Sequence, residues 1–182
     1  MQDTGIVRRI DELGRVVIPK EIRKTLRIKE GDPLEIFTNK DELVFKKYSP
    51  MLAIGQFAGT VADGISELTE KTCIITDNEE VIYVSGGKYK ELKSKKISGD
   101  IEKAINERKS LVISETDGGK ILSIAQGEQI EAENQIIIPV LSGGDCYGSV
   151  IILDKEKSTN INNGDVKIAQ LGATFLAKQF EI

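Results

Sequence analysis

The side chains with the most evident chemistry in this sequence are the basic ones near its start. Residues 1–50 contain 11 Lys and Arg against 9 Asp and Glu, whereas residues 51–182 contain 14 against 20, so the two parts carry net charges of +2 and −6. A positive end on a chain whose net charge is −4 predicts a polyanion as the partner of that end alone. The alternative is a solvated surface that happens to be rich in lysine.

The spacing of these basic residues favours a binding surface. Pro19 suits the first position of a helix and Glu21 its first turn, so residues 20–27, "KEIRKTLR", are predicted to form two helical turns. Ile22 and Leu26 fall on one face of that helix. The opposite face carries four cations: Lys20, Arg23, Lys24 and Arg27. The helix dipole favours one or two cations near a C-terminus, so a stripe of four indicates an exposed binding face.

The residues around this helix have the composition of short strands. β-Branched and aromatic residues alternate with turn residues in four segments: 4–11, 14–19, 33–37 and 42–48. The predicted order is β-β-α-β-β. Fifty such residues bury little surface, and the open edges of a small sheet invite pairing with another chain. We therefore expect an obligate dimer of residues 1–50, which places Arg8, Arg9 and Arg15 beside the basic face of the helix.

The stretch "TGIVRRIDELGRVVIPKEIRKTLRIKEGDPLEIF", followed by "LVFKKY", resembles the N-terminal domain of AbrB-type transition-state regulators. The resemblance implies an all-β swapped-hairpin barrel, formed by an intertwined dimer, that binds double-stranded DNA. The DNA-contacting positions of that family correspond here to Arg8, Arg15, Arg23 and Lys24. We add Arg9 to this set of expected DNA-binding residues. Lys24 departs from the arginine common there and lacks the planar fork that binds a phosphate or guanine through two hydrogen bonds. DNA shape would supply much of the preference, so the binding should tolerate varied sequences.

Residues 51–182 are patterned as an α+β domain. A helix is predicted over residues 50–70, with Ser49 as its cap and Pro50 at its first position. Its apolar face holds Ile54, Phe57, Ala58, Val61, Ile65 and Leu68. Strands are predicted at 72–77, 80–86, 111–114, 121–125, 134–141 and 146–154, and polar helices at 88–96 and 98–109.

The last predicted helix, residues 163–182, has two apolar stripes. The first repeats every three or four residues, as in a coiled coil, and contains Val166, Ala169, Ala173, Leu176 and Phe180. The second contains Ile168, Leu171 and Phe175. One stripe can pack on the sheet and the other on a second subunit, and Leu176 is expected in the contact between subunits. The alternative is a helix that serves only its own core.

This order of elements, with a central antiparallel sheet flanked by the first and last helices, resembles a GAF domain. The resemblance implies a sensor and oligomerisation domain over residues 51–182, whose terminal helices join N-terminal dimers into a tetramer. A dimer in which the same two chains share both interfaces stays open as an alternative. A small-molecule effector of unknown identity is compatible with this fold. A cavity for it could be lined by Tyr83, Ser85, Tyr89, Ser114 and Tyr147; the alternatives are ordinary sheet residues and an empty, purely structural domain.

Residue types argue against catalysis and cofactors. The chain has no histidine, and Cys73 and Cys146 belong to no C-x-x-C pair, so they are expected to be buried apolar residues. The pairs Gly118-Gly119 and Gly143-Gly144 lie between predicted strands, and no Gly-Lys-Ser/Thr follows either of them, which favours turns over phosphate loops. We expect no metal, no cofactor and no enzymatic activity.

The resemblances together imply a sporulation-type transcriptional regulator. No apolar run approaches the ~20 residues that a membrane helix needs, and the first residues lack the pattern of a signal peptide, so we expect a cytoplasmic protein without a membrane partner. Two other classes stay open. An antitoxin would share the N-terminal fold and neutralise a partner protein, and an enzyme would need a nucleotide-hydrolysing or other catalytic site in the second half.

Overall fold

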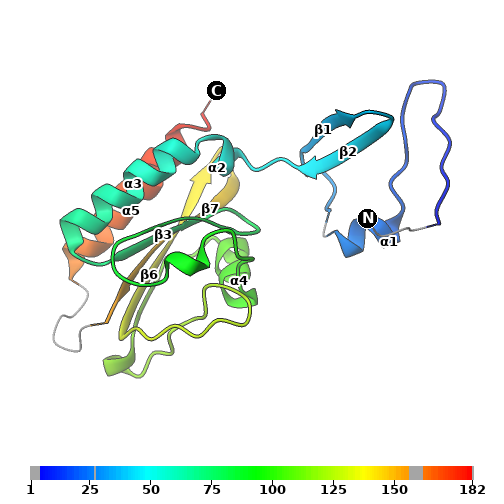
Figure 1. Ribbon diagram of the computed structural model, residues 1–182. Helices are drawn as coiled ribbons and strands as arrows, with labels where there is room; N and C mark the ends of the chain where they lie inside the picture. Colours follow the sequence, from blue (N-terminus) through cyan, green and yellow to red (C-terminus); the bar gives the residue numbers. More distant parts are fainter. Residues whose placement is uncertain (1–4, 27, 156–161, 182) are drawn as a thin grey trace. The chain divides into compact units, whose positions relative to one another are not determined.

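The chain divides into two compact units (Figure 1). The computed structural model describes residues 5–26, 28–155 and 162–181. The first unit spans Met1–Tyr48 and the second spans Ser49–Ile182. Among the helices of the described residues, none has both the length and the apolar character needed to cross a membrane.

The first unit contains one short helix and one two-stranded antiparallel sheet. The helix α1 spans Lys20–Thr25, and the strand β1 (Leu34–Asn39) pairs with β2 (Glu42–Lys47). The prediction of a helix followed by two strands is confirmed. Pro19 is the N-cap residue of α1 rather than its first residue, because its ψ of 147° keeps it extended.

The two strands predicted before α1 are not formed in the described residues 5–19. Two backbone hydrogen bonds, from the N–H of Asp11 to the carbonyl of Arg15 and from the N–H of Gly14 to the carbonyl of Asp11, make only a turn there. A strand needs a neighbour for its N–H and C=O groups, and no described strand pairs with this segment. The segment is extended and its side chains are largely exposed, with Val7 86% exposed.

The second unit is built on a five-stranded antiparallel sheet in the order β4-β3-β7-β6-β5. Its strands are β3 (Thr72–Thr76), β4 (Val81–Ser85), β5 (Leu111–Ser114), β6 (Asn134–Ser142) and β7 (Asp145–Asp154). Its helices are α2 (Pro50–Ala53), α3 (Gly55–Thr69), α4 (Gly99–Glu107) and α5 (Asn163–Lys178), with short 3-10 helices η1 (Lys90–Leu92) and η2 (Glu115–Asp117).

Both faces of this sheet are covered. The helices α3 and α5 lie side by side on one face, and α4 lies on the other with the irregular segment 121–132 (Figure 1). Neighbouring residues alternate between the two cores, so that Ile75 and Ile152 face α3 and α5 whereas Ile74 and Ile151 face α4. Because both faces are buried, the central strands are continuous apolar runs rather than alternating ones.

The helix predicted over residues 50–70 is two helices. Ser49 caps α2 as expected, since its hydroxyl oxygen accepts the N–H of Leu52 at 3.2 Å. Ile54 then leaves the helical conformation with a ψ of 23°, and α3 restarts at Gly55, a residue of low helix propensity. Met51 before the break and Ala58 after it are both fully buried.

The prediction of a polar helix at residues 88–96 is wrong. The segment contains only the short 3-10 helix η1, and its backbone turns away from helical geometry at Tyr89 and Ser94, whose φ angles are 75° and 64°. The N–H of Ser94 donates to the carbonyl of Val81 at 2.8 Å. Pairing with the start of β4 therefore takes the place of helical hydrogen bonds.

The strand predicted at residues 121–125 is irregular as well. The side-chain amide of Gln135, which is fully buried, accepts the N–H of Leu122 at 2.8 Å and donates to its carbonyl at 3.1 Å. The N–H of Ser98 donates to the carbonyl of Ile124. The Gln135 side chain and the backbone N–H of Ser98 thus bond the N–H and C=O groups of this segment, which a neighbouring strand would bond in a regular sheet.

The start of α5 is fixed by a nearly buried ion group. The Nζ atom of Lys71 lies 3.3 Å from Asp165 Oδ2 and 3.7 Å from Asp154 Oδ2. Asp165 also forms a capping box with Asn162 at the N-terminus of the helix. These contacts hold α5 against the end of β7.

Gly143 and Gly144 connect β6 to β7 as a two-residue turn. Both have positive φ angles, 57° and 90°, between the paired residues Ser142 and Asp145, which confirms the predicted turn. We expect Gly144→Ala to lower the free energy of unfolding by about 1–3 kcal/mol, because alanine is strained at this φ although its Cβ meets no neighbour. Urea unfolding of the full chain measures the change.

Gly99→Ala is the matched control for this prediction. Gly99 begins α4 without a positive φ, and a Cβ there also meets no neighbouring atom. Alanine should therefore be neutral or slightly stabilising at that position. Equal losses in the two variants would contradict the assignment of strain to the turn.

Candidate nucleic-acid interface

A tight turn over residues 11–15 presents Arg15. Asp11 Oδ1 accepts the N–H groups of Leu13 and Arg15 at 3.0 and 2.8 Å, and Gly14 supplies the positive φ of 76°. The Nε of Arg15 donates to Asp11 Oδ2 at 2.8 Å. The backbone N–H and the guanidinium of Arg15 hold the pKa of the Asp11 carboxyl below its usual value. The turn therefore keeps an ionised acceptor beside an exposed guanidinium at neutral pH.

The helix α1 presents the next basic side chains. Arg23 and Lys24 are exposed in its last turn, and Lys20 is exposed at its start. Ile22 is half-buried, whereas Leu26 is exposed although the pattern placed both on the packed face. Arg27, the fourth cation of the predicted stripe, lies outside the described residues.

Arg8 and Arg9 lie on the extended segment before the turn and are exposed. All five residues predicted to bind DNA are thus solvent-facing positions of the first unit. Three of them belong to the segment 5–19 and two to α1. Exposure of this kind is what contacts to phosphate oxygens require.

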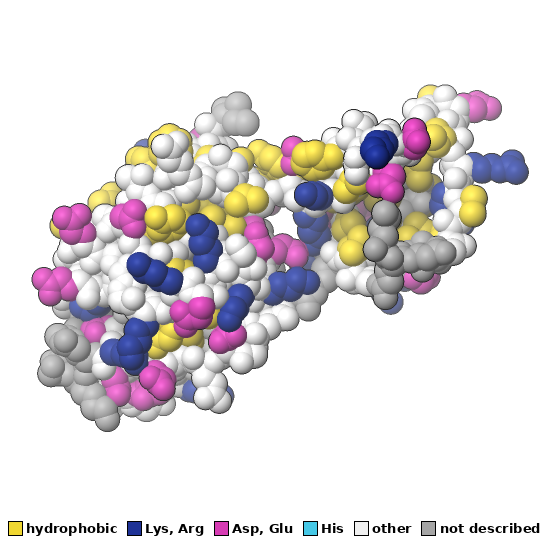
Figure 2. Space-filling view, viewed as in Figure 1, with side chains coloured by type: hydrophobic (Ala, Val, Ile, Leu, Met, Phe, Trp, Pro, Cys, Tyr) yellow, Lys and Arg dark blue, Asp and Glu magenta, His cyan; other side chains and the backbone are white. Residues whose placement is uncertain are grey.

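The first unit also exposes much apolar surface. Figure 2 shows apolar and basic side chains together on the visible side of this unit. Some of the apolar side chains form cross-strand pairs of the β1–β2 sheet, such as Ile36 with Phe45. The exposed members are Ile6, Val7, Ile10, Leu13, Val16, Val17, Leu26, Ile36, Phe37, Leu43 and Phe45. Exposed apolar surface that forms a large patch is typical of an interaction site.

The five side chains proposed to line an effector cavity do not surround one space. Tyr83 and Tyr147 pack against the core under α3 and α5, and Tyr147 stacks on Phe180 with ring centroids 4.3 Å apart. Tyr89 packs against the core on the other face of the sheet, and its hydroxyl donates to the carbonyl of Glu131 at 2.8 Å. Ser85 donates to Asp63 and Ser114 pairs with Thr116, so these hydroxyls already have protein partners.

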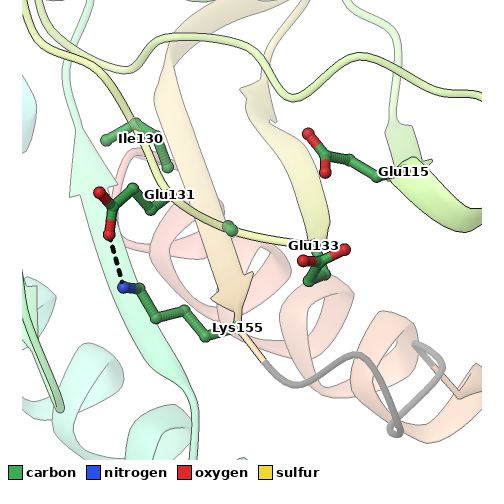
Figure 3. Close-up of a pocket in the computed structure, with 6 residues that line it drawn as sticks. Glu115, Ile130, Glu131, Glu133 and Lys155 are labelled. Carbon is green, nitrogen blue, oxygen red and sulfur yellow. Dashed lines mark hydrogen bonds and ion pairs between the residues drawn. The ribbon is translucent and has the colours of Figure 1, made fainter.

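An open depression of about 300 Å³ lies elsewhere on the second unit (Figure 3). Figure 3 shows Glu131 and Lys155 pointing toward each other, with the Oε2 and Nζ atoms 3.0 Å apart. The hydrogen bond from Lys155 lowers the pKa of Glu131. Its lining is Glu115, Ile130, Glu131, Ala132, Glu133 and Lys155. Three carboxylates make this depression unsuited to a polyanion.

The two cysteines lie in different environments. Cys73 is fully buried, as expected, and burial raises the pKa of its thiol to about 12. Cys146 is only half-buried. Among the described residues, no group of three or more His, Cys, Asp or Glu side chains is arranged to hold a metal ion.

Comparison with known proteins places the chain in a family. A family model described as stage V sporulation protein T C-terminal, transcription factor, matches residues 53–181. Stage V sporulation protein T of Bacillus subtilis (strain 168) is 41% identical over 182 residues, which are 100% of this chain and 99% of that protein. The chain belongs to the stage V sporulation protein T family.

The two units of the chain also match different proteins when each is compared by itself. A model described as antidote-toxin recognition MazE, bacterial antitoxin, matches residues 7–52. The transition state regulatory protein AbrB of Bacillus subtilis (strain 168) is 52% identical over 63 residues, 35% of this chain and 65% of AbrB. The GAF domain of an Acinetobacter phosphoenolpyruvate-protein phosphotransferase matches 69% of this chain and 80% of its own, with a TM-score of 0.56 and 9% identity. The predicted AbrB-type and GAF-like folds are confirmed.

The GAF-like unit exposes an apolar surface on α3 and α5. The sequence pattern places Leu176, from the other stripe of α5, in the contact between subunits. The coiled-coil-like stripe of α5 packs on its own sheet, and Leu176 is 0% exposed rather than available to a second subunit. Leu171 and Phe175, in the second stripe, are 70% and 44% exposed. Phe175 lies 6.5 Å, between ring centroids, from Phe57 of α3, and Leu68 of α3 is also exposed. The signal for this surface was present in the spacing of the second stripe.

Proposed function

We propose that this protein is a DNA-binding transcriptional regulator of sporulation that acts in the cytoplasm on the chromosome. Residues 1–50 act as the DNA-binding domain and residues 51–182 as the sensor and oligomerisation domain. The observation that carries the proposal is the exposed basic surface of the first unit in an acidic chain. Its members are Arg8, Arg9, Arg15, Arg23 and Lys24. The similarity to stage V sporulation protein T and to AbrB supports the same function.

The first units act as an intertwined dimer. Apolar side chains at the surface of residues 5–48 support this step, because a two-stranded sheet with a helix of 6 residues buries too little to be stable alone. The extended segment 5–19 would gain ladder partners from a second copy, completing the swapped-hairpin barrel. Such a dimer doubles the basic surface and presents it with two-fold symmetry.

The GAF-like units join these dimers into a tetramer. The exposed apolar side chains of α3 and α5 support a contact between copies: Phe57, Leu68, Leu171 and Phe175. Binding of DNA would then draw on several basic surfaces in one assembly, which raises affinity without any new contact. The second unit contributes through assembly, and the proposal requires no catalytic step.

The antitoxin alternative has weaker support. Residues 7–52 match the MazE model, but the partner-binding part of such an antitoxin was expected to be an acidic tail without a core. Residues 49–182 instead contain a five-stranded sheet with two apolar cores. The second unit therefore favours an oligomeric regulator.

Fluorescence anisotropy of a labelled duplex, titrated with the full chain at several salt concentrations, tests the function. Each phosphate neutralised contributes about −0.9 to the slope of log affinity against log salt. We expect a slope of about −4.5 or steeper, equivalent to about five or more neutralised phosphates, and binding that varies little among promoter duplexes. Absence of binding at low salt would contradict the proposal and direct attention to a protein partner for the basic surface.

A further inference from the structure

The covalent connection between the two units is short, and each of its residues is held within one unit. The strand β2 ends at Lys47 and α2 begins at Pro50, so only Tyr48 and Ser49 lie between them. The N–H of Tyr48 donates to the carbonyl of Pro33 at 3.0 Å within the first unit. Ser49 is the first residue of the second unit. The two units are therefore joined directly through these two residues.

The hydroxyl of Ser49 acts as both an acceptor and a donor inside the second unit. Its oxygen accepts the N–H of Leu52 at 3.2 Å, which caps α2. Its proton is donated to Asp77 Oδ2 at 2.6 Å. Asp77 is only 6% exposed and directly follows β3, so this hydrogen bond attaches the start of the second unit to the end of a core strand.

Asp77 in turn holds the connection between β3 and β4. Its Oδ1 accepts the N–H groups of Glu79 and Glu80, both at 2.7 Å. The carbonyl of Glu79 accepts the N–H of Ile97 at 2.9 Å, and Ile97 belongs to the core under α4. One carboxylate thus links Ser49 to the part of the GAF-like unit that packs around α4.

We infer that Ser49 and Asp77 are positioning residues for DNA binding, because their hydrogen bond fixes the point from which the DNA-binding unit leaves the GAF-like unit. The inference rests on the proposed DNA-binding function. A connection that is ordered before binding loses less conformational entropy when several basic surfaces engage one duplex. Any change in the β3–β4 connection also reaches Ser49 through the same carboxylate, which gives the second unit a route to alter DNA affinity.

The test compares full-length variants in the anisotropy titration. Ser49→Ala removes the donor, and Ser49→Thr keeps a hydroxyl that can cap α2 and bond Asp77. We expect Ser49→Ala to weaken DNA binding about fivefold or more, with an unchanged salt slope since every phosphate contact is retained. Ser49→Thr should restore affinity. Ser110→Ala, at an exposed position of the second unit, should leave affinity unchanged.

A double-variant cycle separates this effect from loss of the helix cap. If Ser49 acts through Asp77, then Asp77→Ala combined with Ser49→Ala should weaken binding no more than the stronger single variant. Tryptic cleavage after Lys47 should also be faster in Ser49→Ala under native conditions, because the adjoining residues are released. Circular dichroism melting checks that each variant is folded. If Asp77→Ala unfolds, the DNA affinity and the cleavage rate of Ser49→Ala alone decide whether Ser49 has the positioning role.

The outcomes distinguish the inference from the function on which it rests. Failure of the unmodified chain to bind a duplex would contradict the proposed function itself. Normal binding by the unmodified chain together with an affinity of Ser49→Ala within twofold of it would overturn only the positioning role. Additive losses in the double variant would overturn it as well.

Discussion

Leu176→Asp should unfold the GAF-like unit rather than merely dissociate an assembly. Leu176 is 0% exposed and belongs to the core between α5 and the sheet. Truncating a buried leucine costs about 2–5 kcal/mol, and a carboxylate placed there has no water to solvate it, which adds several kcal/mol. The sum approaches the whole stability of a typical domain, about 5–15 kcal/mol. Circular dichroism and urea unfolding of the full chain should show loss of the cooperative transition.

Phe175→Asp is the matched variant on the neighbouring position of the same helix. Phe175 is 44% exposed, and its described ring contact is with Phe57. Loss of that contact costs about 0.5–1.5 kcal/mol, so the unit should stay folded. Sedimentation should show a smaller assembly, because a charge lies in the proposed contact between copies. A folded Leu176→Asp variant would contradict the described core, and an unchanged sedimentation profile for Phe175→Asp would contradict the proposed interface.

The double variant Arg15→Ala/Arg23→Ala should lower DNA affinity by about 100-fold or more. Arg15 lies at the turn after the extended segment and Arg23 on α1, so the variant removes one cation from each element of the proposed surface. In a dimer four contacts are lost, each worth about 1–3 kcal/mol if it reaches a base edge. If the contacts are to phosphates, the salt slope should fall by about 3 to 4. Anisotropy titration at several salt concentrations measures both quantities.

The fold should survive this double change. The ion pair between Arg15 and Asp11 joins two exposed side chains, so it adds little to stability, and the backbone hydrogen bonds of the turn are retained. The control is Lys103→Ala/Lys120→Ala, which removes the same charge from exposed positions of the second unit. Equal losses of affinity in the two double variants would mean that net charge, and not the proposed surface, determines binding.

Much of the second unit could be predicted from the sequence because its signals are local. Strands such as Thr72–Thr76 and Asn134–Ser142 contain continuous apolar runs with polar residues at their ends, and the turn at Gly143-Gly144 needs only two residues that tolerate positive φ. The segments that were predicted wrongly depend on partners far away in the chain. Residues 121–125 are irregular because Gln135 holds their backbone, and residues 88–96 pair with the start of β4.

The basic surface was predictable for a related reason. Charge and spacing alone place Arg23 and Lys24 on one face of a helix, and both are exposed. The strands expected at 4–11 and 14–19 were not formed in the described part of a single chain, because a strand requires a neighbour and its sequence does not say which chain provides it.

The two stripes of α5 separate what the sequence determined from what the tertiary structure decided. The sequence determined, through a period of 3.6 residues, that Ala173 and Leu176 share one face and that Leu171 and Phe175 share another. Only the packed unit decided that the first face is buried on the sheet and that Gly172 lies close to Ile65 of α3. The physical reason is that periodicity is set by the helix itself, whereas burial is set by surfaces that distant parts of the chain bring into contact.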